Sequence, residues 1–291
     1  MRLASAILAC SLVALPLCAQ QDAAGWIAAG DQAWARRAQG APAGDPGHAA
    51  PGPVREAIGE YRKAIEAAPD NLEARWKLLR SLYFEGEFVA RGSEARQKAF
   101  DQGRKAAEAA LDQLATHAGG RKAIEDLDPA ERAKRLSGVP EAARLYSLAA
   151  AHWGLWGDAF GRFAAARQGV AGTVRDYALT AIALDETVDG AAPHRILGRL
   201  HTLAPHIPFL TGWIDRDKAV SELRRAVELA PEEPLNHVYL ADALLQFQPE
   251  HRAEALAELK ALLDRPPNPA NVIEEESARQ QARELLKEAR Q

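Results

Sequence analysis

Apolar and polar positions along the chain alternate with a helical period, and the helical segments recur in pairs. In the segment REAIGEYRKAIEAAP, Ala57, Tyr61 and Ala64 follow one another at spacings of three or four residues. These spacings place the three side chains on one face of a helix. Small residues on such a face let a second helix approach closely, and large ones fill the groove between the two helices. The pattern therefore predicts pairs of packed helices.

A proline closes this segment, as in the 34-residue tetratricopeptide repeat. The sequence contains about five diverged pairs of this type, and we expect a charged last helix at 270–290 to cap the stack and face water. This predicts an all-α superhelical solenoid with loop insertions and a C-terminal capping helix; an irregular helical bundle is the alternative. The expected pairs are 25–34 with 55–69, 71–86 with 93–114, 140–154 with 173–186, 192–201 with 218–231, and 235–245 with 252–263.

Insertions separate the two helices of several pairs. The insertion at 39–53 is rich in Pro, Gly and Ala and is expected to form a surface loop. The insertions WGLWGDAFGRF (153–163) and LAPHIPFLTGW (203–213) are instead aromatic and apolar. In the first, if a helix ends at Trp153 and another spans 157–166, Phe160 and Phe163 lie on one face. In the second, Gly212 is expected to permit a sharp return of the chain.

The apolar side chains of these two insertions are the candidate binding residues. A loop that faces water is normally polar, so these side chains either fill gaps in the solenoid core or form a cleft or an anchor patch for a partner. The sequence leaves both interpretations open. The candidates are Trp153, Trp156, Phe160, Phe163, Ile207, Phe209 and Trp213.

Three helix starts carry residues that can accept hydrogen bonds from the first free backbone amides. Asp128 precedes a proline, Thr173 is followed three residues later by an acid, and Asp215 precedes a charged helical segment. Each is therefore expected to cap a helix.

The first nineteen residues have the layout of a secretory signal peptide. A positive Arg2 precedes an uncharged apolar run at 3–17, and a small residue, Ala19, precedes a polar segment. We expect cleavage after Ala19, export to the periplasm, and a mature chain of one solenoid domain at 20–291.

Both cysteines, Cys10 and Cys18, lie in this leader, so a mature chain cleaved after Ala19 has no thiol for a disulfide or a thiolate site. Acylation of Cys18 is the alternative and would anchor the protein to a membrane.

Composition and motifs argue against several other classes of protein. The net charge of −4 gives no basic field for nucleic acid. The sequence has no phosphate-binding glycine loop, no H-E-x-x-H and no G-x-S-x-G. We therefore expect no catalytic residue and no cofactor. A metal site built from His194, His201, His206 and His237 is a reserve hypothesis, because imidazole suits zinc and copper.

The segment 190–245 is the part of the chain that most resembles a known family. Its Leu197-Gly198 pair, the Pro/Gly insertion, the charged start of the next helix and the closing Pro231 resemble the TatT-like family, the T components of TRAP transporters. The upstream WGLWG also fits, and the resemblance extends over roughly residues 55–265.

The resemblance implies an exported, non-catalytic helical protein with a concave surface or pore. It implies association with a periplasmic solute-binding protein, and a passage for a small apolar ligand. The alternative is a general envelope scaffold for protein–protein interaction with no ligand passage. The sequence leaves the ligand and the oligomeric state open.

Overall fold

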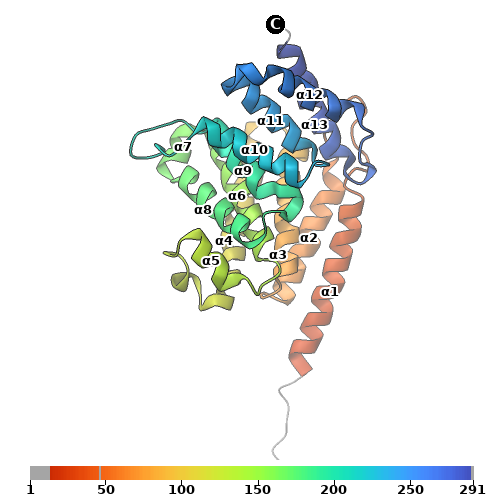
Figure 1. The fold of residues 1–291 in the computed structure, drawn as a ribbon. Coiled ribbons are helices and arrows are strands. Elements are labelled where there is room, and N and C mark those ends of the chain that lie inside the picture. Colours follow the sequence, from red (N-terminus) through yellow and green to blue (C-terminus); the bar gives the residue numbers. More distant parts are fainter. Residues whose placement is uncertain (1–13, 46, 290–291) are drawn as a thin grey trace, which may run out of the picture.

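The computed structural model describes residues 14–45 and 47–289, and every regular element in these ranges is a helix (Figure 1). Residues 1–13 of the expected leader, with Cys10, lie outside the described residues. The first described helix, α1, begins at Ala14 and continues through Ala19, the expected cleavage position.

Five helix pairs follow one another along the chain and confirm the expected solenoid. The helices of each pair contact one another, and neighbouring pairs stack. The pairs are α1 (Ala14–Ala35) with α2 (Pro51–Ala67), α3 (Leu72–Phe84) with α4 (Gly92–Ala115), α6 (Ala142–Phe160) with α8 (Val170–Asp185), α9 (Val188–Leu203) with α10 (Arg216–Leu229), and α11 (Pro234–Phe247) with α12 (Arg252–Asp264); α13 (Val272–Glu288) ends the stack.

Shorter elements connect these pairs. A π-helical turn extends α3, and two short helices lie in the insertions between α4 and α8. They are η1 (Glu85–Val89), α5 (Pro129–Leu136) and α7 (Arg162–Arg167), and the single 3₁₀ turns are η2 (Thr116–Ala118), η3 (Arg121–Ala123), η4 (Pro249–His251) and η5 (Pro269–Asn271).

Glycines set the close approach of the paired helices. A Cβ atom added to Gly30 would lie 2.4 Å from the Tyr61 ring, and one added to Gly198 would lie 2.5 Å from Leu223 Cγ. Both distances are shorter than van der Waals contact. In these two pairs, a glycine in the first helix therefore makes room for a large side chain of the second, and the two helices can approach closely.

Apolar burial follows the helical faces that the sequence predicts. Tyr61, Ala57 and Ala64 are fully buried between α1, α2 and α3. A larger cluster around Phe100 and Leu145 joins α3, α4, α6 and α8, and another joins α10 to α13. The core is therefore distributed along the stack, as expected of a solenoid in which each pair mainly contacts its neighbours.

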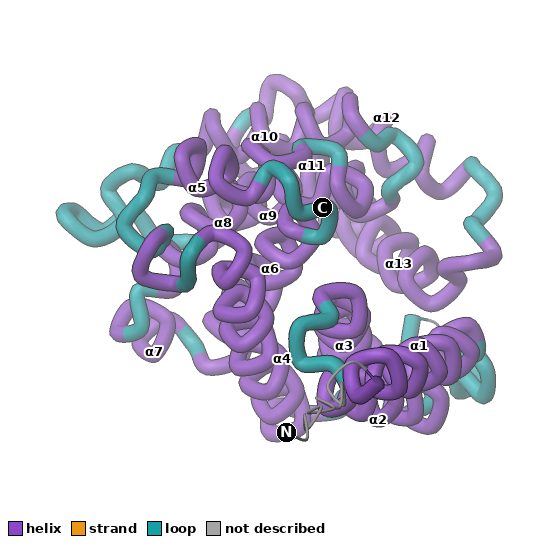
Figure 2. Tube along the Cα trace, turned by 90° about the horizontal axis from the view of Figure 1, so that it is seen from below, coloured by secondary structure: helices purple, strands orange, loops and turns teal. Residues whose placement is uncertain are grey.

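The two ends of the stack meet. Arg37, after α1, donates to Glu274 Oε1 at 2.9 Å and to the Ala270 carbonyl at 2.6 Å. A Cβ atom on Gly47 would lie 2.8 Å from Ser277 Cα, so this loop runs against α13. In Figure 2, α13 and α1 lie near one another on the same side of the molecule.

The expectation that the last helix faces water is therefore only half right. One of its faces does. The other buries Glu275 and Arg279, which lie 3.5 Å apart, against the end of the stack. Arg279 donates there to the carbonyls of Leu263 and Arg265 at the end of α12, so this face of the charged helix is covered by the preceding pair.

The helix starts agree with the sequence at two of three positions. Asp128 accepts hydrogen bonds from Ala130 and Glu131, and Asp215 accepts them from Asp217 and Lys218.

The cap expected at Thr173 is wrong, because α8 begins three residues earlier, after Gly169, whose φ is +64°. Thr173 lies inside the helix and donates to the Gly169 carbonyl instead.

Candidate functional site

The helices enclose a central cavity of about 1290 Å³. The first helix of each pair contributes to its wall, together with α4, α8, α13 and the insertions. Charged side chains in the lining balance, with seven arginines and seven acids. The aromatic lining residues are Trp34, Trp76, Tyr83, Phe84, Phe88 and Tyr239; the arginines are Arg37, Arg80, Arg96, Arg144, Arg162, Arg195 and Arg199.

Arginine and tryptophan side chains alternate along one wall of the cavity. The guanidinium carbons of Arg37 and Arg80 lie 4.6 and 4.1 Å from the Trp34 ring centre. Those of Arg80 and Arg144 lie 5.0 and 4.6 Å from the Trp76 ring centre. These distances are in the range of cation–π contacts. We call these five residues, from α1 and the turn after it, α3 and α6, the Arg–Trp ladder.

Two tyrosines lie deep in the same cavity. Burial raises the pKa of the Tyr83 hydroxyl, and the nearby Glu87 carboxylate raises it further. Burial likewise raises the pKa of the Tyr239 hydroxyl, although Arg199, 4.6 Å above the ring, opposes this shift. Both hydroxyls therefore stay protonated and can donate hydrogen bonds to a bound molecule. The cavity combines aromatic walls with a few polar groups, as ligand sites commonly do.

Large apolar side chains are exposed mainly on the two aromatic insertions. Eight large hydrophobic residues are exposed in the described part of the chain, and only Trp26 and Val272 lie elsewhere. Phe163 is 88% exposed and Phe209 fully so. Both insertions also contribute to the cavity wall, so they lie at its edge. We call the six residues the insertion patch: Phe160, Phe163, Leu203, Ile207, Phe209 and Leu210.

The loop that carries half of this patch, between α9 and α10, is held in shape by hydrogen bonds. The Thr211 hydroxyl accepts from the Ile207 amide at 2.9 Å and donates to the Pro205 carbonyl at 2.5 Å. Arg216 donates to the carbonyl of Thr202 at 2.8 Å, beyond the last hydrogen bonds of α9. The sequence indicated neither anchor, since a threonine or arginine of this kind has no distinctive spacing.

The loop does not reverse direction at Gly212 through a left-handed backbone, as the sequence had suggested. The left-handed backbone is at Phe209, with φ of +65°, and Gly212 does not adopt it. A bulky residue in this region is strained. The loop therefore holds an exposed aromatic ring at its tip at some cost in free energy.

The candidate residues in the first insertion divide into two groups. Trp153 and Trp156 are buried, and Trp153 donates its indole hydrogen to Glu108 at 2.6 Å. No helix break occurs at Trp153, because α6 continues to Phe160 and ends at Gly161, whose φ is +86°. Phe160 stacks on Trp156 with ring centres 4.6 Å apart, whereas Phe163 points away on α7.

Trp213 and Ile207 occupy intermediate positions. Trp213 is half-buried, with its ring 5.7 Å from that of His201 and beneath the guanidinium of Arg175 at 4.2 Å. It joins the second insertion to α8 and α9. Ile207 is exposed and also lines the cavity. The seven candidates therefore do not form one site, and a binding role for them stays a prediction.

The histidines bind separate partners. His194 contacts Glu222 at 2.6 Å and Glu186 at 3.2 Å, and His237 contacts Glu258 at 2.6 Å. Within residues 14–45 and 47–289, no three His, Cys, Asp or Glu side chains gather as a metal ion would require.

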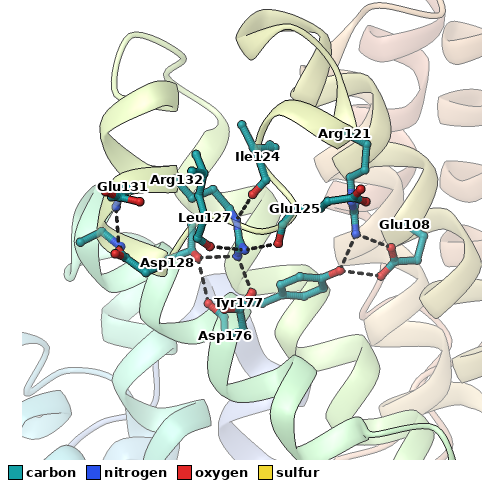
Figure 3. Close-up of polar contacts among 12 residues, drawn as sticks. Glu108, Arg121, Ile124, Glu125, Leu127, Asp128, Glu131, Arg132, Asp176 and Tyr177 are labelled. Carbon is teal, nitrogen blue, oxygen red and sulfur yellow. Dashed lines mark hydrogen bonds and ion pairs between the residues drawn. The ribbon is translucent and has the colours of Figure 1, made fainter.

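A second, smaller cavity of about 310 Å³ lies beside α5 and α8. Arg132 donates there to the carbonyls of Ile124 and Leu127 and to Asp176 (Figure 3). Nearby, Arg121 bridges Glu108 and the Tyr177 hydroxyl. These arginines are bound by protein groups and fasten the irregular segment 118–139 to α8, so we assign this cluster a structural role.

Across the described part of the chain, no helix has both the length and the apolarity needed to cross a bilayer.

Comparisons with known proteins bear on the fold. No protein-family model matches the chain, and no curated protein matches it. Among solved structures, the chain is similar to TTC0263, a thermophilic TPR protein of Thermus thermophilus, with a TM-score of 0.52, 16% identity, and coverage of 91% of this chain and 99% of that one.

Two further structures match less well. MamA gives a TM-score of 0.41 at 16% identity, over 82% of this chain and 89% of that one. Yeast Tom70 gives 0.31 at 16% identity, over 92% of this chain and 65% of that one. The similarity to TTC0263, together with the five helix pairs, shows that the chain has the fold of a tetratricopeptide-repeat solenoid.

Proposed function

We propose that this protein is a non-catalytic helical-repeat scaffold that binds another protein through the insertion patch. The observation that carries the proposal is the concentration of exposed apolar side chains on two insertions at the edge of one cavity. Exposed apolar groups that are concentrated in this way are typical of interaction surfaces, and aromatic side chains are common anchors.

The loop that presents Phe209 supports this proposal. Its backbone is strained at the tip, and Thr211 and Arg216 nevertheless hold it in one shape. Strained residues that the surrounding structure holds in place are often functional. An anchor held in this way loses less conformational entropy on binding than a flexible one.

The resemblance to the TatT-like family suggests a more specific partner. We propose that the mature chain is periplasmic and that the partner is the solute-binding protein of a TRAP-type transporter. The leader pattern at 1–19 and the segment 190–245 support this version. The alternative is another envelope protein, bound by the same patch.

Crosslinked pull-down from the periplasm tests both versions. We expect the wild type to capture a partner and a Phe163→Ser/Phe209→Ser variant to lose it, because both rings are exposed and their loss removes anchor contacts only. The matched control is Val272→Ser, which removes an exposed apolar side chain at the start of α13, outside both insertions. Equal capture by wild type and double variant would contradict the patch; capture of an envelope protein other than a solute-binding protein would contradict the transporter version alone.

A further inference from the structure

The central arginine of the Arg–Trp ladder lacks an acidic partner. The outer arginines have one each: Arg37 pairs with Glu274 and Arg144 with Asp189, both at 2.9 Å. Among the described residues, Arg80 forms no ion pair, and its Nε is buried without a hydrogen-bond partner.

The nearest acid to Arg80 is already engaged. Asp31 accepts a hydrogen bond from the Tyr61 hydroxyl through one oxygen, at 2.8 Å, and pairs with Lys77 through the other, at 2.6 Å. Burial lowers the pKa of the Arg80 guanidinium, and the nearby Tyr61 hydroxyl and Asp31 carboxylate oppose this shift. The guanidinium stays charged at neutral pH. A buried charge without a partner is costly, and an anion placed beside it offsets that cost.

The geometry of the ladder suits anion binding at this position. Trp34 and Trp76 contact the guanidinium of Arg80 at 4.1 and 5.0 Å from their ring centres. Contacts to aromatic faces leave the N–H groups at the edge of the guanidinium plane free for hydrogen bonds. Those groups form the fork that binds carboxylate, sulfonate or phosphate oxygens in pairs.

The rest of the cavity favours an apolar body next to this head group. Phe84, Phe88, Leu148 and Leu155 line the cavity, and Tyr83 adds a hydroxyl that can donate a hydrogen bond. From these contacts we propose that the central cavity binds an amphipathic organic anion, its anionic group on Arg80 and its aromatic or aliphatic body along the apolar wall. This inference goes beyond the proposed protein partner and does not depend on it.

The acids of the cavity limit where the anion can lie. Glu232 and Glu233 stand at the start of α11, and Glu274 and Glu275 on α13. An anion is repelled by the carboxylates at the start of α11, so a position beside Arg80 is favoured over that wall. Glu274 is paired with Arg37 at the outer end of the ladder, which leaves Arg80 as the ladder arginine without an acid. The position of an anion in the cavity is therefore determined by the charges next to it, and not by the balanced total charge of the lining.

Two dyes with the same apolar body test the proposal. Anilinonaphthalene sulfonate carries an anionic group, and phenylnaphthylamine is its neutral counterpart. We expect Arg80→Gln to weaken sulfonate binding about tenfold or more, as for the loss of a charge-assisted hydrogen bond, and to change neutral-dye binding less than about twofold. Fluorescence titration measures both. The control is Arg135→Gln, which removes an exposed arginine on α5, outside the cavity lining.

Further arms keep the test decisive. Arg80→Lys retains the charge but loses the planar fork, so we expect an intermediate loss for the sulfonate alone. The Phe163→Ser/Phe209→Ser variant should bind the sulfonate as the wild type does, even if its partner capture fails. Three results would overturn the proposal: equal affinity of the wild type for both dyes, equal losses for both dyes in Arg80→Gln, or loss of sulfonate binding in the patch variant alone.

Discussion

The insertion at 153–163 and the insertion at 203–213 have similar compositions, but the fold uses them differently. The first continues α6 by two turns and buries Trp153 and Trp156 against α4. The second leaves the helix stack, and Phe209 at its tip is fully exposed.

The two insertions differ because only the first can continue the backbone hydrogen bonds of the helix before it. In the first insertion the glycines at 154 and 157 remain helical, and Gly157 lets Val170 approach closely. In the second, Pro205 and Pro208 cannot supply the amide hydrogens that a continuing helix needs. Aromatic composition therefore does not by itself indicate a binding surface.

The largest effect should follow from removal of a buried ring. Trp156→Ala should lower the free energy of unfolding by about 3–5 kcal/mol, because it leaves a cavity between α4 and α6. Trp156→Phe should cost less than half of this, since it keeps most of the ring volume and the indole hydrogen has no partner in the described structure. Urea denaturation measures both. A small loss for the alanine variant would contradict the distinction between the two insertions.

A buried histidine on α6 should make the stability of this region depend on pH. Burial lowers the pKa of His152 from 6.5 to about 4, although its hydrogen bond to the Leu79 carbonyl opposes the shift. The unfolded chain therefore binds a proton that the folded one does not. We expect the contribution of neutral His152 to the free energy of unfolding to be fully present above pH 6.5. It should be lost as the pH falls towards 4, by about 3 kcal/mol in all.

Urea titrations at about pH 7 and about pH 4.5 test this effect. We expect His152→Gln to lose less stability between the two values than the wild type does. His206→Gln, which changes an exposed histidine in the second insertion, should follow the wild type. Identical pH dependence of wild type and His152→Gln would show that burial does not shift this pKa.

The smallest effect on stability should come from the exposed rings. Phe163→Ser/Phe209→Ser should change the free energy of unfolding by no more than about 0.5 kcal/mol, because neither ring is packed. The same denaturation experiment measures it. A loss comparable to that of Trp156→Ala would mean that the insertions pack alike and that their exposure is not a functional feature.

Much of the fold could be predicted from local pattern. The sequence predicted the buried face of α2 from Ala57, Tyr61 and Ala64, and that of α9 from the residues around Gly198. Both predictions were possible because helical period and small-residue spacing are local properties. Asp128 and Asp215 capped the helices that follow them for the same reason. Thr173 did not, since Val170 packs against Gly157 and extends α8 backwards.

The candidate site was less predictable. Trp76 and Arg80 are four residues apart on α3 and so share a face. Trp34 and Arg144 come from α1 and α6, and no spacing in the sequence marks them as neighbours of that pair. Nor did the charged composition of α13 indicate that Arg37 would bind it and close the ring.

The sequence by itself determined the helical period, the pairing of helices and the places where insertions interrupt them. These features depend on contacts between residues close in the chain. Tertiary structure alone decided that the first and last helices meet, and that Arg80 lies between two tryptophans without an acid. Each of these depends on the accumulated rotation of successive helix pairs, which a local pattern does not fix.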